Sequence, residues 1–185
     1  IEQILSPAFP FELVSAKNTD RIAWIEYERG MRNVYTAVPP NFELIRLTNN
    51  MEDDGIDLSS LRISDDGSVI AFVRGHTPNS SGWIANPSSF TSGGERAIWA
   101  VNTSGGEPQK LAIASNPVLS PDGKWVLFTQ SGQIYRVKTD QSGYLSPVDK
   151  GEQPLFRGYG NNSSPQWSPD GKKIAFASSR GGHSY

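Results

Sequence analysis

The sequence predicts an all-β fold made of repeated units, and three observations lead to this prediction. A tight-turn motif, SDDG or SPDG, recurs at residues 64–67, 120–123 and 168–171. A short apolar run of strand type follows each copy, as in SVIAFV, KWVLFT and KKIAFA. The chain also has 18 glycines and 13 prolines, most of them between such runs. No segment carries a helical apolar pattern over three turns, so strands and turns account for the chain.

The turn motif has a physical explanation that does not involve catalysis. Proline presets φ to about −65° at the second position of a tight turn, and aspartate hydrogen-bonds to the backbone of its own turn. The following glycine accepts a positive φ. We expect Ser64, Ser120 and Ser168 to accept hydrogen bonds from turn amides. The motif is therefore interpreted as architecture and not as an active site.

Aromatic residues give the repeat its period. One aromatic position follows each tight turn, and a second lies on the next strand. The two sets are Trp24, Phe72, Phe128 and Phe176, and Tyr35, Trp99 and Tyr135. Successive members of the first set are separated by 48, 56 and 48 residues. A unit of this length fits four short strands with their turns, which is the size of a β-propeller blade. We predict a partial β-propeller with three four-stranded blades and the start of a fourth.

The blade boundaries follow from the same spacing, and one blade carries an inserted loop. The blades are expected at roughly 7–55, 56–114, 115–160 and, incomplete, 161–185. The longer separation of 56 residues, between Phe72 and Phe128, comes from a loop over 75–96 that is rich in Gly, Ser, Asn and Pro. Long loops in compact domains often carry function. Its residues Trp83, Ile84 and Phe90 lead us to expect that the loop packs on neighbouring structure.

Composition excludes several classes of function. The net charge of −2 and the absence of a basic face argue against a nucleic-acid partner. No apolar run approaches the roughly 18 residues of a spanning helix, so no membrane partner is expected. The chain has no cysteine, which removes disulfides and thiol chemistry. His76 and His183 lack a third ligand at metal-binding spacing and a serine marked as a nucleophile. No catalytic, cofactor-binding or metal-ligating residue is predicted.

Candidates for contact with a substrate lie in and beside the inserted loop. Arginine can pair a substrate carboxylate through two hydrogen bonds, and exposed aromatic or imidazole groups can orient a peptide. On this basis Arg74, His76, Trp83 and Arg96 are candidate substrate-gating residues. The acidic stretch over 52–57 can bind a cation or a substrate amine, but solvated acids in a loop between blades are the expected state.

The order of these segments resembles the amino-terminal propeller of the prolyl oligopeptidase family of serine peptidases. The segments are IEQILSPAFPFELVSA, RIAWIEYERGMRNVY, LTNNMEDDG, GGERAIWAVNTSGGEPQKL and SPQWSPDGKKIAFASSRGGHSY. The resemblance is strongest to bacterial dipeptidyl- or acylaminoacyl-peptidase-like members. It implies an α/β-hydrolase domain after the propeller, with a G-x-S-x-G nucleophile elbow. No such elbow occurs here, so this chain is expected not to hydrolyse peptides itself but to gate or orient peptide substrates for that domain.

An alternative is a non-enzymatic binding propeller that resembles the periplasmic TolB family and mediates protein–protein interaction. That family shares the WSPDGKKIAF-type strand and the SSRGG turn, both present in the last unit. Its α/β domain precedes the blades, and no such segment is found before residue 18, while the inserted loop favours the peptidase interpretation. Both resemblances imply a periplasmic or secreted location more than a cytoplasmic one.

The predicted arc of blades also carries a prediction about association. A propeller protects its strand edges by closing into a ring. Three blades and part of a fourth cannot close alone. We therefore expect self-association, with the open ends of the arc covered by a second copy.

Overall fold

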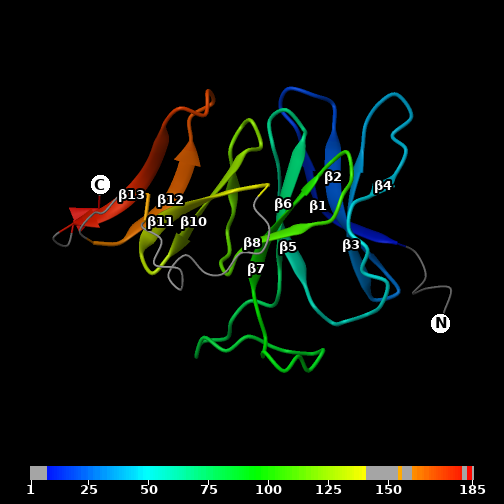
Figure 1. Cartoon of the computed structure of the whole chain (residues 1–185), viewed down its shortest axis with the longest axis horizontal. Helices are drawn as coiled ribbons and strands as arrows, with labels where there is room; N and C mark the ends of the chain where they lie inside the picture. Colours follow the sequence, from blue (N-terminus) through cyan, green and yellow to red (C-terminus); the bar gives the residue numbers. More distant parts are fainter. Residues whose placement is uncertain (1–7, 141–153, 156–159, 181–182, 185) are drawn as a thin grey trace.

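The computed structural model describes residues 8–140, 154–155, 160–180 and 183–184. Across these ranges every regular element is a β-strand, and the strands form four separate antiparallel sheets. The sheets follow one another in an arc, with the amino-terminal sheet at one end and the carboxy-terminal sheet at the other (Figure 1). The all-β, partial-propeller prediction is confirmed.

Each sheet is a meander in which consecutive strands pair. The first sheet contains β1 (Phe9–Ser15), β2 (Ile22–Glu28), β3 (Met31–Ala37) and β4 (Ile45–Arg46). The second contains β5 (Leu58–Ile63), β6 (Val69–Arg74), β7 (Ala97–Asn102) and β8 (Gln109–Ala112). The third contains β9 (Val118–Leu119), β10 (Trp125–Gln130) and β11 (Gln133–Lys138). The fourth contains β12 (Asn162–Trp167), β13 (Ile174–Arg180) and β14 (His183–Ser184).

The outer strand expected for the third sheet, QPLFRG over 153–158, lies mostly outside the described residues. One hydrogen bond marks its place, because the Leu155 amide donates to the Ile134 carbonyl at 2.8 Å. In the first sheet the Leu47 amide donates to the Val34 carbonyl in the same way, also at 2.8 Å. Leu155 therefore lies beside β11 in the third sheet, at the place that Leu47, just after β4, takes beside β3 in the first sheet.

The three tight turns share one hydrogen-bond pattern. In the first, the Ser64 hydroxyl donates to Asp66 Oδ1 at 2.5 Å and accepts from the Val69 amide at 3.1 Å. The Ser68 amide donates to the same Asp66 oxygen at 2.9 Å, and Gly67 has a φ of +73°. The turns at 120–123 and 168–171 repeat this arrangement. The predicted roles of serine and glycine are confirmed.

These hydrogen bonds change the acidity of the turn aspartates. Burial acts to raise the pKa of Asp66, but the hydrogen bonds donated by Ser64 and Ser68 outweigh it, so this pKa lies below its ordinary value. The pKa of Asp122 is lowered by the same balance, with Ser120 and Lys124 as donors. The ionised aspartate is thus a structural part of the turn.

The aromatic residues identified from the spacing are direct cross-strand partners. Trp24 pairs with Tyr35, Phe72 with Trp99 and Phe128 with Tyr135. The rings of the first and third pairs stack, with centroids 5.9 and 5.8 Å apart. In the second and third sheets this aromatic face packs against the preceding sheet and is buried. Large side chains on the aromatic face of one sheet therefore meet small or branched side chains of the preceding sheet. These smaller side chains include Ala23, Ile25, Ala71 and Val73.

The innermost strands share a bulge that the sequence pattern does not reveal. The inner strand of each sheet is its first strand, β1, β5, β9 or β12. One residue in or just before each of these strands has a left-handed backbone, with φ between 51° and 58°: Glu12, Ser60, Asn116 and Ser164. These residues are separated by 48, 56 and 48 residues, as the aromatic positions are. Glu12 also links two sheets, because its Oε2 accepts from the Leu61 amide at 2.8 Å. Pro117 and Pro165 occupy the position of Leu61 in the next two sheets. Because proline has no backbone N–H, these positions need no hydrogen-bond acceptor.

Candidate functional site

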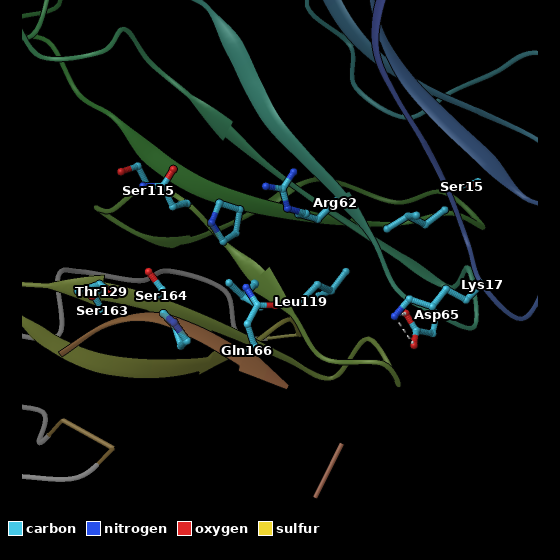
Figure 2. Close-up of a pocket in the computed structure, with 15 residues that line it drawn as sticks. Ser15, Lys17, Arg62, Asp65, Ser115, Leu119, Thr129, Ser163, Ser164 and Gln166 are labelled. Carbon is cyan, nitrogen blue, oxygen red and sulfur yellow. Dashed lines mark hydrogen bonds and ion pairs between the residues drawn. The ribbon is translucent and has the colours of Figure 1, made fainter. Parts of the chain in front are cut away.

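A hollow lies along the inner edges of all four sheets. Its volume is about 680 Å³, within the range of ligand pockets. Figure 2 shows that residues of the inner strands β1, β5, β9 and β12 and of adjoining turns, together with Thr129 of β10, line this axial cleft. Its lining residues are Ser15, Lys17, Arg62, Ile63, Asp65, Ser115, Asn116, Pro117, Val118, Leu119, Thr129, Ser163, Ser164, Pro165 and Gln166.

The axial cleft is polar and contains Arg62, which has no ion-pair partner among the described residues. Hydroxyl and amide groups dominate the lining. Lys17 Nζ and Asp65 Oδ1 form an ion pair at 2.9 Å, so their charges offset each other. The Arg62 guanidinium donates to the Leu61 carbonyl at 2.7 Å, and no carboxylate of the described chain forms an ion pair with it. Because arginine can donate five hydrogen bonds, the cleft can accept an anionic or carbonyl-rich ligand at Arg62.

Nothing in the sequence marks Arg62 as a residue of the cleft. It stands in the run SSLRIS, in which no neighbouring motif marks it. The signal that could have identified it is its place just before the first tight turn, on a strand that the repeat assigns to the inner edge. The orientation of that strand toward the ring axis becomes evident only when all four sheets are assembled.

The inserted loop over 75–96 connects β6 to β7 and projects from one rim of the arc (Figure 1). Its entry requires glycine, because a Cβ on Gly75 would lie 2.0 Å from the Glu95 carbonyl oxygen and the φ is +123°. At its exit, Arg96 Nη1 donates to the Gly75 carbonyl at 2.8 Å. The two ends of the loop are therefore fastened to each other.

Ionic contacts join the acidic stretch between the first two sheets to residues of β3, β6 and the inserted loop. Arg74, the last residue of β6, forms an ion pair with Asp54. Arg32 on β3 forms an ion pair with Asp53, at 3.1 Å. Asp57 lies 2.8 Å from His76 Nδ1 in the inserted loop. The side chains of Asp53 and Asp57 remain solvated, as expected, while each also has a cationic or imidazole neighbour.

His76 lies within reach of two acceptors at once. Its Nε2 is 2.8 Å from the Gly55 carbonyl oxygen, on the side of the ring opposite the Asp57 contact. The two ring nitrogens thus contact two residues of the acidic stretch at once, and His76 holds the loop against that stretch.

The aromatic residues of the inserted loop do not pack as expected. Trp83 is 66% exposed and Phe90 is 47% exposed. The loop is held instead by polar contacts, among them Lys110 Nζ to Glu95 Oε2 at 2.5 Å and Ser88 Oγ to the Asp54 carbonyl at 2.6 Å. Trp83 and Phe90 therefore present apolar surface to solvent on a fastened loop.

The structure brings three of the four candidate residues to one rim. Arg74 and His76 contact neighbouring residues of the acidic stretch. Arg96 donates to the carbonyl of Gly75, which lies between Arg74 and His76 in the chain. Its Nη2 also lies 3.5 Å from Ser59 Oγ on β5, the strand that carries Arg62 into the axial cleft. Trp83 lies farther along the loop. The His183 side chain is outside the described part. Within the described ranges, no three His, Asp or Glu side chains gather as metal ligands, and no helix is long and apolar enough to cross a membrane.

Comparisons with known proteins agree with the fold. No family model matches the chain. Uncharacterized protein Atu1656 of Agrobacterium fabrum is 37% identical over 97 residues, which are 48% of this chain and 30% of that protein. TolB from Acinetobacter baumannii superposes with a TM-score of 0.55 at 20% identity, over 96% of this chain and 39% of TolB. A prolyl endopeptidase superposes with a TM-score of 0.60 at 14% identity, over 94% of this chain and 26% of the enzyme.

These similarities establish the propeller fold, but they do not establish an activity. At identities of 20% and 14%, the two structures support shared architecture. The chain spans less than half the length of each of the three proteins. Any activity of those full-length proteins can therefore only be proposed for this chain.

Proposed function

We propose that this chain is the non-catalytic propeller segment of a serine peptidase of the prolyl oligopeptidase family, in which it orients or gates peptides for an α/β-hydrolase domain. The axial cleft carries this proposal. Its volume of about 680 Å³ suits a few residues of extended peptide. Its hydroxyl and amide lining can hydrogen-bond a peptide backbone, and Arg62 can receive a carboxylate.

The inserted loop supports a gating role in the same proposal. The contacts of His76 with Asp57 and of Glu95 with Lys110 fasten the loop to the rim. Arg96 reaches Ser59 near the beginning of β5. Trp83 and Phe90 remain exposed on the loop, and exposed aromatic side chains are favoured contact residues at interfaces. The loop is suited to meet either an entering peptide or the neighbouring catalytic domain.

Peptide binding by the purified chain tests the role of the cleft. A short fluorescent peptide with a free carboxy terminus is the probe, and fluorescence anisotropy is the measurement. Arg62→Gln is expected to weaken binding by about tenfold, the loss of one charged hydrogen bond. Arg136→Gln is the matched control, because Arg136 stacks on Trp125, away from the cleft. Equal binding by the wild type and Arg62→Gln would contradict the proposal.

Hydrolysis assays test the other half of the proposal. Dipeptidyl and acylaminoacyl chromogenic substrates are expected to stay intact with the purified chain. Turnover that a serine-directed inhibitor abolishes would refute the non-catalytic assignment. A G-x-S-x-G elbow some distance downstream in the same reading frame is the expected genetic signature.

A TolB-like binding propeller is the second candidate. The superposition on TolB over 96% of the chain and the exposed Trp83 favour it. Its ligand would be another protein, bound through the inserted loop and the rim. Under this candidate, Trp83→Ser weakens capture of the partner and Arg62→Gln does not, whereas the peptidase proposal expects peptide affinity to depend on Arg62. An α/β domain encoded upstream of the blades would also decide for this candidate.

A further inference from the structure

We propose that a cavity between the inserted loop and the second sheet, here called the loop cavity, binds a small molecule that joins one carboxylate to one apolar or aromatic group. Its walls come from the inserted loop, Arg74 at the end of β6, Trp99 on β7 and Lys110 on β8. Its volume is about 200 Å³, below the roughly 300–1,000 Å³ of sites for larger ligands, so it suits a molecule of the size of one amino-acid residue. The inference does not depend on the proposed peptidase role, because it concerns a different cavity from the axial cleft.

Hydrogen bonds within the inserted loop hold one wall of the loop cavity in place. The side-chain amide of Asn86 accepts from the Phe90 N–H at 3.0 Å and donates to the Phe90 carbonyl at 2.8 Å. Ser88 Oγ ties the same turn to the acidic stretch by donating to the Asp54 carbonyl at 2.6 Å. A Cβ on Gly94 would lie 2.3 Å from the carbonyl oxygen at residue 84, so two stretches of the loop lie against each other there. Because this wall is already ordered, a ligand pays little conformational entropy to bind against it.

One part of the lining is apolar. Ile56, Pro87, Phe90 and Trp99 contribute to it. Trp99 is partly buried, since it packs against the core between the first two sheets and also lines the loop cavity. Phe90 is 47% exposed, so a ring or an aliphatic chain placed in the cavity would remove apolar surface from water.

The polar part of the lining carries more positive than negative charge. Arg74 and Lys110 are its cations, and Glu95 is the one acidic residue among the lining residues. Lys110 Nζ donates to Glu95 Oε2 at 2.5 Å. Arg74 Nη2 contacts Asp54, which does not line the cavity. A ligand ammonium group would therefore meet two like charges, whereas a carboxylate would meet two opposite ones.

Both cations keep N–H donors that their acid partners do not use. Guanidinium and ammonium groups each have several donors, and the described residues accept only one from Arg74 and one from Lys110. The indole N–H of Trp99 has no acceptor in the described ranges either, whereas those of Trp24 and Trp167 do. A carboxylate can accept from donors of this kind, so the polar part selects the head group and the apolar part selects what is attached to it.

Nuclear magnetic resonance titration of the isotope-labelled chain with N-acetylphenylalanine is the test. The signal of the Trp99 indole N–H, identified by its loss in Trp99→Phe, is expected to shift with a dissociation constant on the order of 1 mM. The amide of the same compound, which lacks the charge, is expected to bind about tenfold more weakly. Acetate, which lacks the ring, is expected to leave the signal in place.

Variants with matched controls assign the binding to the loop cavity. Lys110→Gln and Phe90→Ser are each expected to weaken binding by about fivefold or more, and both side chains are partly exposed, so the variants should fold, which circular dichroism checks. Trp83→Ser is the control for Phe90→Ser, because Trp83 is the other exposed aromatic residue of the loop and does not line the cavity. Arg62→Gln is the control for Lys110→Gln, because Arg62 lines the axial cleft. Both controls are expected to bind as the wild type does.

Three results would overturn the inference. The first is an unchanged Trp99 signal at probe concentrations well above the expected dissociation constant. The second is equal affinity for the acid and its amide, which would mean that the spare donors do not bind a carboxylate. The third is binding that Arg62→Gln weakens and Lys110→Gln does not, which would place the probe in the axial cleft. In that case the inference fails while the proposed function keeps its support.

Discussion

Truncation of Phe128 is the most direct test of how the sheets pack. Phe128 is fully buried, its ring stacks on Tyr135 with centroids 5.8 Å apart, and it packs against the second sheet. Phe128→Ala removes these contacts and leaves a cavity, which costs about 3–5 kcal/mol in well-packed cores. A domain of ordinary stability has only about 5–15 kcal/mol to lose. One substitution is therefore expected to remove a fifth or more of the free energy of unfolding.

Urea denaturation measures this loss. With a slope of about 2 kcal/mol per molar urea, the midpoint is expected to fall by about 1.5–2.5 M while the slope stays unchanged. Far-ultraviolet circular dichroism and tryptophan fluorescence should give the same transition, as a single cooperative unit requires. Trp83→Ala is the control and is expected to stay within about 0.5 kcal/mol, because Trp83 is 66% exposed. A cost below about 1 kcal/mol for Phe128→Ala would refute the assignment of Phe128 to the contact between sheets.

Three further substitutions test contacts of different kinds. Glu12→Ala leaves the Leu61 amide without its acceptor and is expected to cost about 1–2 kcal/mol in urea denaturation, whereas Glu12→Gln, which keeps an acceptor oxygen, costs less; equal losses would contradict this. Gly75→Ala places a Cβ 2.0 Å from the Glu95 carbonyl at a positive φ and is expected to lower the melting temperature clearly; an unchanged melting temperature would contradict the strained geometry. The lowered pKa of Asp122 stabilises the fold above about pH 4, the ordinary value of the unfolded chain, and this contribution is lost as the pH falls through the folded pKa. Asp122→Asn is therefore expected to be less stable than the wild type at neutral pH, with the difference shrinking in acid; a difference independent of pH would argue against it.

The parts of the fold that the sequence predicts are those set by local chemistry and by period. The SPDG turns need glycine at a positive φ and a serine beside an ionised aspartate, and these residue types are visible in the chain. The aromatic positions are likewise visible, because each sheet needs one large pair at the same place. Trp24 and Tyr35, matched through spacing alone, are cross-strand partners in the structure.

The inner-strand bulge could not be predicted, because its residues share a backbone state and not a chemistry. Glu12, Ser60, Asn116 and Ser164 are acidic, hydroxyl and amide residues, and none is a glycine that would signal a positive φ. Their common spacing becomes meaningful only once the strands are placed around an axis. Arg62 escaped notice for the same reason, since its access to the axial cleft depends on all four sheets together.

The ion pairs of the acidic stretch were missed because they join segments far apart in the sequence. Asp54 and Arg74 are separated by 20 residues, and Asp57 and His76 by 19, with β5 and β6 in the intervening sequence. The sequence does not reveal that Arg74 and His76 lie beside these acids, although Asp53 and Asp57 keep the solvent exposure expected of them. Sequence reasoning also expected Trp83 to be covered, since an apolar residue in a loop usually has a neighbour within its own chain.

The directional packing of the sheets positions the axial cleft. In the second and third sheets the aromatic face packs against small and branched side chains of the preceding sheet. This packing brings the inner strands side by side, so residues of all four sheets, Arg62 among them, line one cleft.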